Sequence, residues 1–224
     1  MPESIAYNID CMDYMRSLPD KAFDLAVVDP VYGGVTQGGY MDKSTRGKIM
    51  GTGAAKQIEY HMGLWQQQKT GEDYFRELFR VSKNQIIWGG NYYQTAICHD
   101  SQCWIVWDKE NDNTGFADCE LAWTSFNAAT RIFRFMWNGM LQGNMKNKEV
   151  RIHPTQKPVA LYKWILSRYA KHGDRILDTH LGSGSSRIAA WDMGFDFVGC
   201  EIDKEYFDME ERRFKEHSAQ LRLI

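Results

Sequence analysis

Apolar and polar residues alternate along this chain in blocks that predict short strands followed by longer helices. Buried strands are expected where short apolar runs, several rich in β-branched or aromatic residues, end at turn residues. These runs are 23–30, 85–89, 104–107, 120–126, 131–135, 175–178 and 195–201. Helical spacing is found at 71–81, 158–170, 185–193 and 204–217. Strands that alternate with helices predict an α/β fold with a doubly wound, mostly parallel sheet.

One long stretch does not fit this alternation. Residues 33–69 contain eight glycines and no clear periodicity, which is typical of a mobile, substrate-facing loop rather than of a sheet. At 224 residues, the chain as a whole, 1–224, is expected to be a single domain.

Composition narrows the class of protein further. Hydrophobic residues make up 43% of the chain, but no apolar run approaches the roughly 18 residues that cross a bilayer. The N-terminus, MPESIAYNID, lacks the basic and then apolar pattern of a signal peptide, so no membrane contact and a cytoplasmic location are expected. The five cysteines are scattered without a CxxC pair, so neither a disulfide framework nor a metal site is expected.

The formal net charge of −2 conceals two basic segments. Residues 33–69 carry a net charge of +3, and residues 127–157 carry +5. An acidic body with two basic inserts is a suitable layout for holding a polyanion such as DNA, although ordinary surface loops explain the charge equally well. Within the second insert, Trp137 is the residue expected to wedge into or stack on nucleic acid.

A site for a nucleotide-like ligand is predicted within RILDTHLGSGSSRIAAWDMGFDFVGCEID, which reads as strand, glycine-rich turn, helix and strand. Gly182 and Gly184 allow a tight turn and a close approach of the backbone to a ligand. Glu201, 23 residues after Asp178, is placed to accept hydrogen bonds from two ribose hydroxyls. Arg187 stands where a dinucleotide motif has its third glycine, and Asp178 would repel a pyrophosphate but hold a cation. These residues favour S-adenosylmethionine over NAD.

A second candidate site follows the predicted strand 23–28. The turn DPVY brings together the Asp29 carboxylate, the Pro30 carbonyl and the Tyr32 ring, at the carboxyl edge of a sheet, where α/β proteins bind ligands. Taken alone, this turn also fits a structural role, in which Asp29 caps the backbone and Tyr32 covers the core.

The two sites together resemble a known family. DPVY resembles the DPPY motif of DNA amino-methyltransferases (N-4/N-6 DNA methylases), and IHPTQKPVALYKWIL followed by LDTHLGSGSS resembles the cofactor motifs of their beta group. The substrate motif precedes the cofactor motif, as in that group. WGGNYY and ADCELAWTSF resemble short phage and prophage members. The resemblance implies a seven-stranded, Rossmann-like methyltransferase sheet with circularly permuted motif order and a small target-recognition insert at 127–157.

The resemblance also implies which residues bind S-adenosylmethionine. They are Asp10 at the adenine, Thr155, Lys157 and Pro158 beside the amino acid, Asp178, Gly182, Ser183 and Gly184 at the methionine end, and Glu201 at the ribose. Asp29, Pro30 and Tyr32 are implied to hold the target base. Two positions depart from the family pattern: Val31 replaces the second proline of the motif, and His180 replaces an aromatic residue.

The implied reaction is chemically consistent with these residues. If Asp29 and the Pro30 carbonyl each accept one hydrogen of a base amine, the lone pair of the nitrogen points toward an electrophilic methyl group. Positioning of this kind can reach roughly 7–11 kcal/mol, and Tyr32 offers a ring for a flipped base. Aspartate at the first motif position resembles the adenine-specific members, whereas serine is usual for enzymes that methylate the cytosine amine.

The expected activity is therefore site-specific methylation of adenine in double-stranded DNA, in a restriction-modification system or a phage. The alternatives are a cytosine-amine (N4) methyltransferase and a non-catalytic relative that only binds nucleic acid. Because the target region is short, one copy is expected to hold little DNA, and a homodimer is one way to complete the contact.

Overall fold

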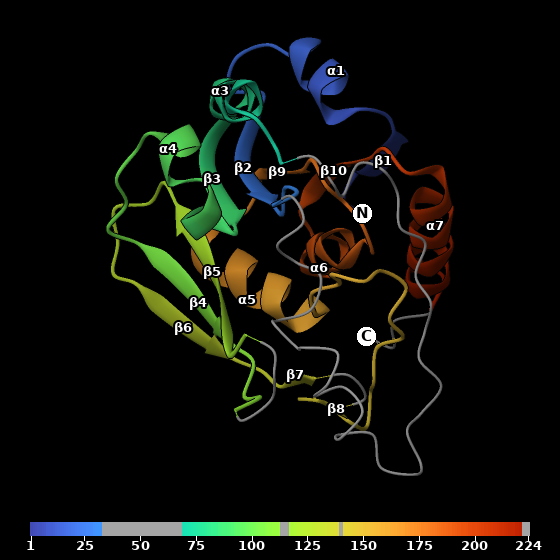
Figure 1. Ribbon diagram of the computed structural model, residues 1–224. Coiled ribbons are helices and arrows are strands. Elements are labelled where there is room, and N and C mark those ends of the chain that lie inside the picture. Colours follow the sequence, from blue (N-terminus) through green and yellow to red (C-terminus); the bar gives the residue numbers. More distant parts are fainter. Residues whose placement is uncertain (33–68, 113–116, 139–140, 221–224) are drawn as a thin grey trace.

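The computed structural model describes residues 1–32, 69–112, 117–138 and 141–220, which form a central sheet with helices on both faces (Figure 1). The strands are β1 (Ser4–Asn8), β2 (Phe23–Val28), β3 (Ser82–Trp88), β4 (Trp104–Asp108), β5 (Cys119–Thr124), β6 (Arg131–Arg134), β7 (Trp137–Asn138), β8 (Leu141–Gln142), β9 (Arg175–Asp178) and β10 (Asp196–Glu201). The helices are α1 (Cys11–Arg16), α3 (Glu72–Val81), η2 (Gly90–Tyr92), α4 (Gln94–Ile97), α5 (Val159–Tyr169), α6 (Ser185–Met193) and α7 (Lys204–Ser218).

The main sheet has the strand order β1-β10-β9-β2-β3-β5-β4-β6. The first five of these strands run parallel, whereas β5 is antiparallel to both of its neighbours, and β6 is parallel to β4. The expected α/β class with a mostly parallel sheet is confirmed. The sheet has eight strands rather than the expected seven, because β1 pairs with the C-terminal strand β10.

Both faces of the sheet are covered, which explains the nearly continuous apolar runs of its strands. Leu25 and Val27 of β2 face the cluster that α5 and α6 complete. Ala26 and Val28, which alternate with them, face the cluster that α1, α3 and α4 complete. None of the described helices combines the length and apolar content that a membrane span requires.

The register of the sheet brings the two predicted motifs together. Leu25 and Ala26 of β2 lie opposite Ile176 and Leu177 of β9, and both strands run in the same direction. Their carboxyl ends therefore meet at one edge of the sheet, although they are far apart in the sequence. The loop expected at 33–69 lies outside the described residues except for Lys69.

Candidate active site

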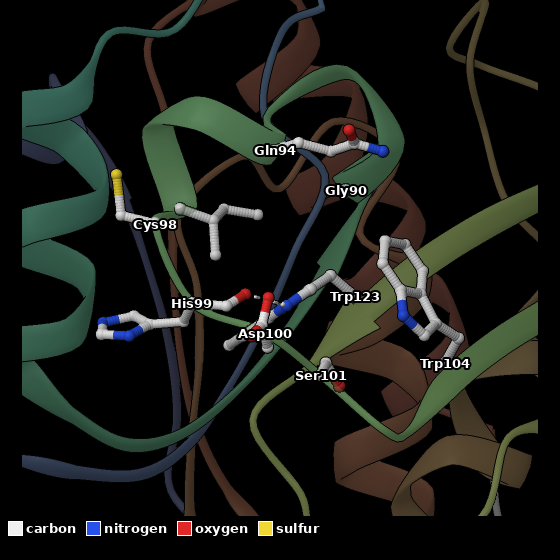
Figure 2. A pocket seen from close by; sticks show the side chains of 9 residues that line it. Gly90, Gln94, Cys98, His99, Asp100, Ser101, Trp104 and Trp123 are labelled. Atoms are coloured by element: carbon white, nitrogen blue, oxygen red, sulfur yellow. Dashed lines mark hydrogen bonds between the residues drawn. The ribbon is translucent and has the colours of Figure 1, made fainter.

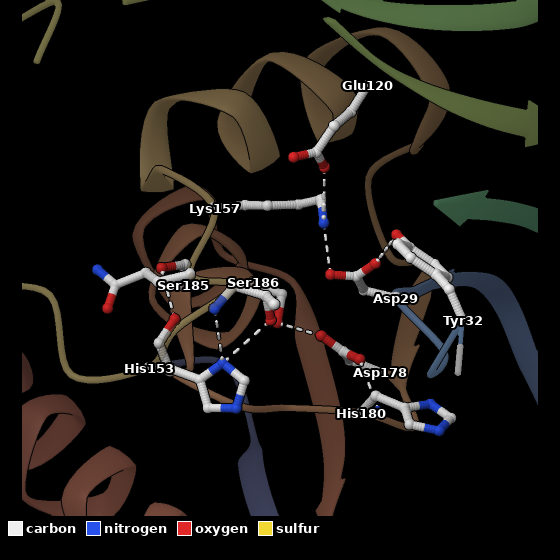
Figure 3. Close-up of polar contacts among 12 residues, drawn as sticks. Asp29, Tyr32, Glu120, His153, Lys157, Asp178, His180, Ser185 and Ser186 are labelled. Atoms are coloured by element: carbon white, nitrogen blue, oxygen red, sulfur yellow. Dashed lines mark hydrogen bonds and ion pairs between the residues drawn. The ribbon is translucent and has the colours of Figure 1, made fainter. Parts of the chain in front are cut away.

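The turn after β2 presents the predicted target motif at the edge of the sheet. Asp29 follows the buried end of the strand, and its Oδ1 accepts a hydrogen bond from the Tyr32 hydroxyl (Figure 3). The Val31 carbonyl accepts from the backbone N–H of Thr70 at 3.1 Å and from the Tyr93 hydroxyl. These contacts hold the turn in place without the second proline that the family pattern contains.

Tyr32 is packed against a glycine that follows the neighbouring strand β3. Gly89 directly follows β3 and has a φ of 66°, and a Cβ at this position would lie 2.1 Å from Tyr32 Cε1. The Tyr32 ring also stacks on Tyr92 with a centroid distance of 5.0 Å. The segment WGGNYY thus supplies both the space for the Tyr32 ring and an aromatic partner for it.

Lys157 reaches the same carboxylate from a distant part of the chain. Its Nζ contacts Asp29 Oδ2 and lies 3.1 Å from Glu120 Oε2, on strand β5 (Figure 3). The Lys157 side chain is only 3% exposed. Lys157, which was expected beside the amino acid of the cofactor, therefore lies between two carboxylates of the target side.

Ion pairing decides the protonation states of Glu120 and Lys157. Burial alone would raise the pKa of Glu120, but the ammonium groups of Lys157 and Lys109 outweigh it and lower that pKa to about 2. Burial opposes the charge of Lys157 as well, yet Asp29 and Glu120 raise its pKa above the ordinary value. Burial and the nearby Asp29 charge raise the pKa of the Tyr32 phenol. At neutral pH, Glu120 is ionised, Lys157 is charged and Tyr32 is a neutral donor.

The turn after β9 contains two glycines whose backbone conformations favour glycine. Gly182 and Gly184 have φ values of 51° and 71°, which favour glycine. The backbone N–H of Gly182 donates to Glu201 Oε2 at 2.8 Å, and the N–H of Asp203 donates to Glu201 Oε1 at 2.9 Å. A Cβ on Gly184 would lie 2.5 Å from Glu210. The buried Glu201 carboxylate therefore fixes the turn to the end of β10.

Asp178 is a second buried carboxylate in this half of the site. It accepts hydrogen bonds from the Ser186 hydroxyl at 2.5 Å and from the His180 N–H at 3.0 Å (Figure 3). Burial raises the pKa of Asp178 to about 7 despite these donors. Burial also raises the pKa of Glu201. Both groups are placed where a cationic ligand would stabilise their ionised forms.

The His180 ring packs against a neighbouring aromatic ring, as the aromatic residue of the family pattern would. Its ring packs edge-on against Tyr74 at a centroid distance of 5.3 Å, and its Nδ1 lies 3.0 Å from Thr179 Oγ1. Burial lowers its pKa to about 4, so the ring is neutral at neutral pH.

Arg187, at the position of the missing third glycine, has a structural role. Its Nη1 contacts both oxygens of Glu210, at 3.0 and 3.1 Å. Its guanidinium group also lies over the Phe214 ring at 3.9 Å. Arg187 thereby joins α6 to α7 beneath the glycine turn.

The remaining predicted cofactor residues differ in burial. Asp10 is exposed and is the N-cap of α1, where its carboxylate accepts from the Met12 N–H at 2.8 Å. Thr155 is exposed, and its hydroxyl lies 3.1 Å from His153 Nδ1. Pro158 is buried and is the N-cap of α5, and Ser183 is buried in the glycine turn.

The basic insert 127–157 is less available to DNA than its charge predicts. Lys157 is buried between carboxylates, and Arg134 lies 3.3 Å from Asp108. The exposed cationic side chains of the insert are Arg131, Arg134, Lys146 and Lys148. Asp108 partly neutralises the charge of Arg134.

The expectation that Trp137 contacts nucleic acid is wrong. Its side chain is buried, its Nε1–H donates to the Gln156 carbonyl at 2.8 Å, and the Arg151 guanidinium covers its ring at 4.5 Å. Trp137 is a core residue that packs the insert against the rest of the domain.

A separate cavity of about 540 Å³ lies beside α4 (Figure 2). Gln94, Cys98, His99, Trp104 and Trp123 are among its lining residues, and none of the predicted site residues lines it. Within the described part of the chain, no three cysteine, histidine or acidic side chains are grouped as metal ligands.

Acidic side chains thus end three neighbouring strands: Asp29 after β2, Asp178 on β9 and Glu201 on β10. Together with the glycine turn, they define an α/β protein of the methyltransferase class. The sequence profile of the DNA methylase family, which covers N6 and N4 enzymes, matches residues 85–212. The chain belongs to this DNA methylase family.

Individual relatives agree with this assignment. The chain is 26% identical over 250 aligned residues to the type II methyltransferase M.HinfI of Haemophilus influenzae, with 92% of this chain and 67% of that protein covered. It is 36% identical over 80 residues to the type II methyltransferase M2.DpnII of Streptococcus pneumoniae, covering 36% of this chain and 30% of the relative.

Solved structures share the fold at low sequence identity. The M1.HpyAVI complex with S-adenosylmethionine has a TM-score of 0.57 at 18% identity, covering 95% of this chain and 98% of that chain. The putative DNA modification methylase TTHA0409 of Thermus thermophilus has a TM-score of 0.60 at 15% identity, covering 99% and 97%. The cytosine-N4-specific PvuII methyltransferase has a TM-score of 0.58 at 13% identity, covering 100% and 89%.

Proposed function

We propose that this protein is an adenine-specific DNA methyltransferase that uses S-adenosylmethionine to methylate the N6 amine of an adenine flipped out of the duplex. One observation carries the proposal: the Asp29 turn and the Asp178–Gly182 segment lie side by side at the carboxyl ends of the adjacent strands β2 and β9. A base held by the first and a cofactor held by the second would meet at one edge of the sheet.

The residues around the glycine turn fit S-adenosylmethionine. When bound, this cofactor supplies an electrophilic methyl group on a sulfonium and departs as a neutral thioether. Asp178 provides a buried negative group for a cationic ligand, and Glu201 provides carboxylate oxygens at the end of β10. Ile202, 53% exposed, offers apolar surface beside Glu201. Asp10 follows Ile9, whose N–H donates to the Glu201 carbonyl at 3.1 Å, so it can contact the same ligand.

The target side would orient the amine. Asp29 and the Pro30 carbonyl accept its two hydrogens, which directs the nitrogen lone pair outward, and Tyr32 stacks on the base. The Tyr32 hydroxyl now donates to Asp29 Oδ1, so the incoming amine replaces one donor with another. After transfer of the methyl group, the nitrogen loses one proton to solvent by way of the Asp29 carboxylate, which already accepts one of its hydrogens, and regains neutrality.

The choice of adenine rests on Asp29. Family members that methylate the cytosine amine usually carry serine at this position, and Asp29 matches the adenine-specific pattern. The insert 127–157 is proposed to contact DNA through its exposed cations, and phosphate contacts of this type position the duplex without reading its sequence.

Methylation-aware sequencing of DNA from cells that express the protein tests the proposal. We expect N6-methyladenine within one short sequence context, and a much lower methylated fraction of those sites in cells that express Asp29→Ala at the same level. If the DNA carried N4-methylcytosine instead, the target base would be cytosine and not adenine. Unmodified DNA, together with calorimetric binding of S-adenosylmethionine by the purified protein, would favour a non-catalytic relative.

A further inference from the structure

Glu120 has no part in the function proposed above, yet it is joined to the target site through Lys157. Its Oε2 lies 3.1 Å from Lys157 Nζ, and its Oε1 lies 2.5 Å from Lys109 Nζ. Lys157 in turn contacts Asp29. The four side chains form a continuous chain of alternating charge that ends at the carboxylate proposed to receive the target amine. Figure 3 shows three of them, Glu120, Lys157 and Asp29.

The Lys157 ammonium group is shielded from solvent, so water cannot take the place of its carboxylate partners. Its side chain is 3% exposed, and its ammonium group lies 5.2 Å from the centroid of the Trp88 ring. A buried ammonium group needs partners for its three N–H donors. Asp29 alone would leave part of this need unmet, and Glu120 supplies a second acceptor from another strand.

We propose that Glu120 is a positioning residue, which holds Lys157 in place and thereby fixes the orientation of the Asp29 carboxylate for methyl transfer. This inference rests on the proposed function. Glu120 touches neither base nor cofactor in this scheme, because its effect passes through Lys157.

Charge gives Glu120 a second effect in the same direction. Positive charge develops on the amine nitrogen as the methyl group arrives, and Asp29 is the negative group placed beside it. An ammonium group shared with Glu120 neutralises Asp29 less completely than one bound to Asp29 alone. Interactions between such buried charges are screened much less than those in water.

Among the described residues, the charged groups that face Lys157 come from three parts of the sheet. Asp29 follows β2, Glu120 is on β5, and Lys109 follows β4 and binds the far side of Glu120. His153 also senses the Lys157 charge, but burial, and then that charge, lower its pKa to about 4, so it is neutral. The two carboxylates raise the pKa of Lys157 against the effect of burial. Removing one of them must therefore lower it.

The test compares Glu120→Gln, Lys157→Met and the double variant in steady-state methyl transfer. A charge-assisted hydrogen bond is worth enough to change a rate by about tenfold or more, so we expect Glu120→Gln to lower kcat at least about tenfold. The KM for DNA and the Kd for S-adenosylmethionine should stay within about twofold. If Glu120 acts only through Lys157, the double variant turns over no more slowly than Lys157→Met.

A pH profile separates positioning from a loss of structure. In Glu120→Gln, Lys157 should lose its proton at lower pH, so the basic limb of the kcat profile should move to lower pH than in the wild type. Glu120→Asp keeps the carboxylate and should recover part of kcat. Glu77→Gln is the matched control, because Glu77 pairs with Arg80 at 2.8 Å and is 20% exposed, against 29% for Glu120, but lies on α3, outside the site. It should leave kcat unchanged.

The outcomes distinguish this inference from the proposed function. A wild-type protein that methylates no DNA would overturn both. An active wild type would overturn the inference alone if Glu120→Gln kept more than a tenth of kcat, if its basic limb did not move, or if the double variant were slower than Lys157→Met. Melting temperatures and calorimetric cofactor binding confirm that each variant is folded.

Discussion

The target side and the cofactor side of the proposed active site each contain two buried or half-buried carboxylates, but their charges are balanced in different ways. On the target side, Asp29 and Glu120 contact Lys157, and Glu120 also contacts Lys109. On the cofactor side, Asp178 and Glu201 accept hydrogen bonds from neutral donors. These donors are the Ser186 hydroxyl and the backbone amides of His180, Gly182 and Asp203.

The ionisation of the carboxylates follows from this difference. The lysines overcome burial and lower the pKa of Glu120 to about 2, whereas burial raises the pKa of Asp178 to about 7. The same residue types at one edge of one sheet therefore behave oppositely: among the described residues, lysines contact the carboxylates of the target side, whereas neutral donors contact Asp178 and Glu201. The cofactor side is suited to a ligand that brings a positive charge with it.

The strongest way to break this comparison is to remove the carboxylate of the target side. We expect Asp29→Ala to lower kcat for methyl transfer by about 10- to 100-fold, the cost of a charge-assisted hydrogen bond. The Kd for S-adenosylmethionine should change little, since the glycine turn is proposed to bind it separately. Turnover and isothermal calorimetry measure the two quantities. A variant that keeps more than a tenth of wild-type turnover would contradict the role of Asp29.

The cofactor side should respond in the opposite order, with binding lost first. Asp178→Asn removes the negative group and should weaken S-adenosylmethionine binding about tenfold at pH 8. Wild-type affinity should rise with pH through about 7, as Asp178 ionises, and the asparagine variant should lack this rise. Calorimetry across pH 6–8 checks both expectations. Equal affinity of the two proteins at pH 8 would exclude Asp178 from the cofactor site.

The same substitution should stabilise the protein without ligand. The folded pKa of Asp178, about 7, is above its ordinary value of 3.8, so the folded state binds the proton more tightly than the unfolded state. The stability that this proton provides is complete below pH 4 and is lost as pH rises to about 7. Asparagine avoids the loss, so its melting temperature should exceed that of the wild type by several degrees at pH 8 and match it near pH 4.

The sequence predicted elements with strong local periodicity and missed those that depend on distant partners. The helices α3, α5 and α6 begin and end within one residue of the ranges expected from apolar spacing. Strand β1 was not predicted, because its five residues form no buried apolar run and gain their partner only from β10, at the other end of the chain.

The candidate site shows the same division. The sequence motifs predicted Asp29 at the carboxyl edge of the sheet and Asp178 at the end of the strand before the glycine turn, and the parallel pairing of β2 and β9 brings the two together. The contacts of Lys157 with Asp29 and Glu120 depend on how an irregular segment packs against the antiparallel strand β5, which no local pattern specifies. The available signal was a glutamate in an otherwise apolar strand, ELAWT.

A smaller effect tests how tightly the target side is packed. Gly89→Ala places a Cβ 2.1 Å from Tyr32 at a φ of 66°, whereas Gly194→Ala has a similar φ of 80° and no neighbour within 4 Å. Both variants pay the conformational cost of about 1 kcal/mol, but only the first displaces Tyr32. We expect Gly89→Ala to be the less stable by about 1–3 kcal/mol in urea unfolding and to lose methyl transfer several-fold. Equal stabilities would mean that Tyr32 is free to move.

The smallest expected effect concerns the outer surface, where neither side of the site is touched. Lys146 and Lys148 are exposed in the basic insert, and phosphate contacts release counterions, so each contributes about 0.9 to the slope of log affinity against log salt. Replacing both with alanine should weaken binding to cognate and scrambled duplexes about equally and reduce the slope by roughly two contacts.

The control for this measurement is a pair of lysines at the opposite edge of the sheet. Lys83 lies at the start of β3 and Lys171 shortly before β9, so both are near the amino ends of strands whose carboxyl ends form the site. Replacing these two with alanine removes the same formal charge and should leave the salt slope unchanged. If the two double variants shift the slope equally, the effect reflects net charge alone. The insert would then lose its proposed place in the DNA interface.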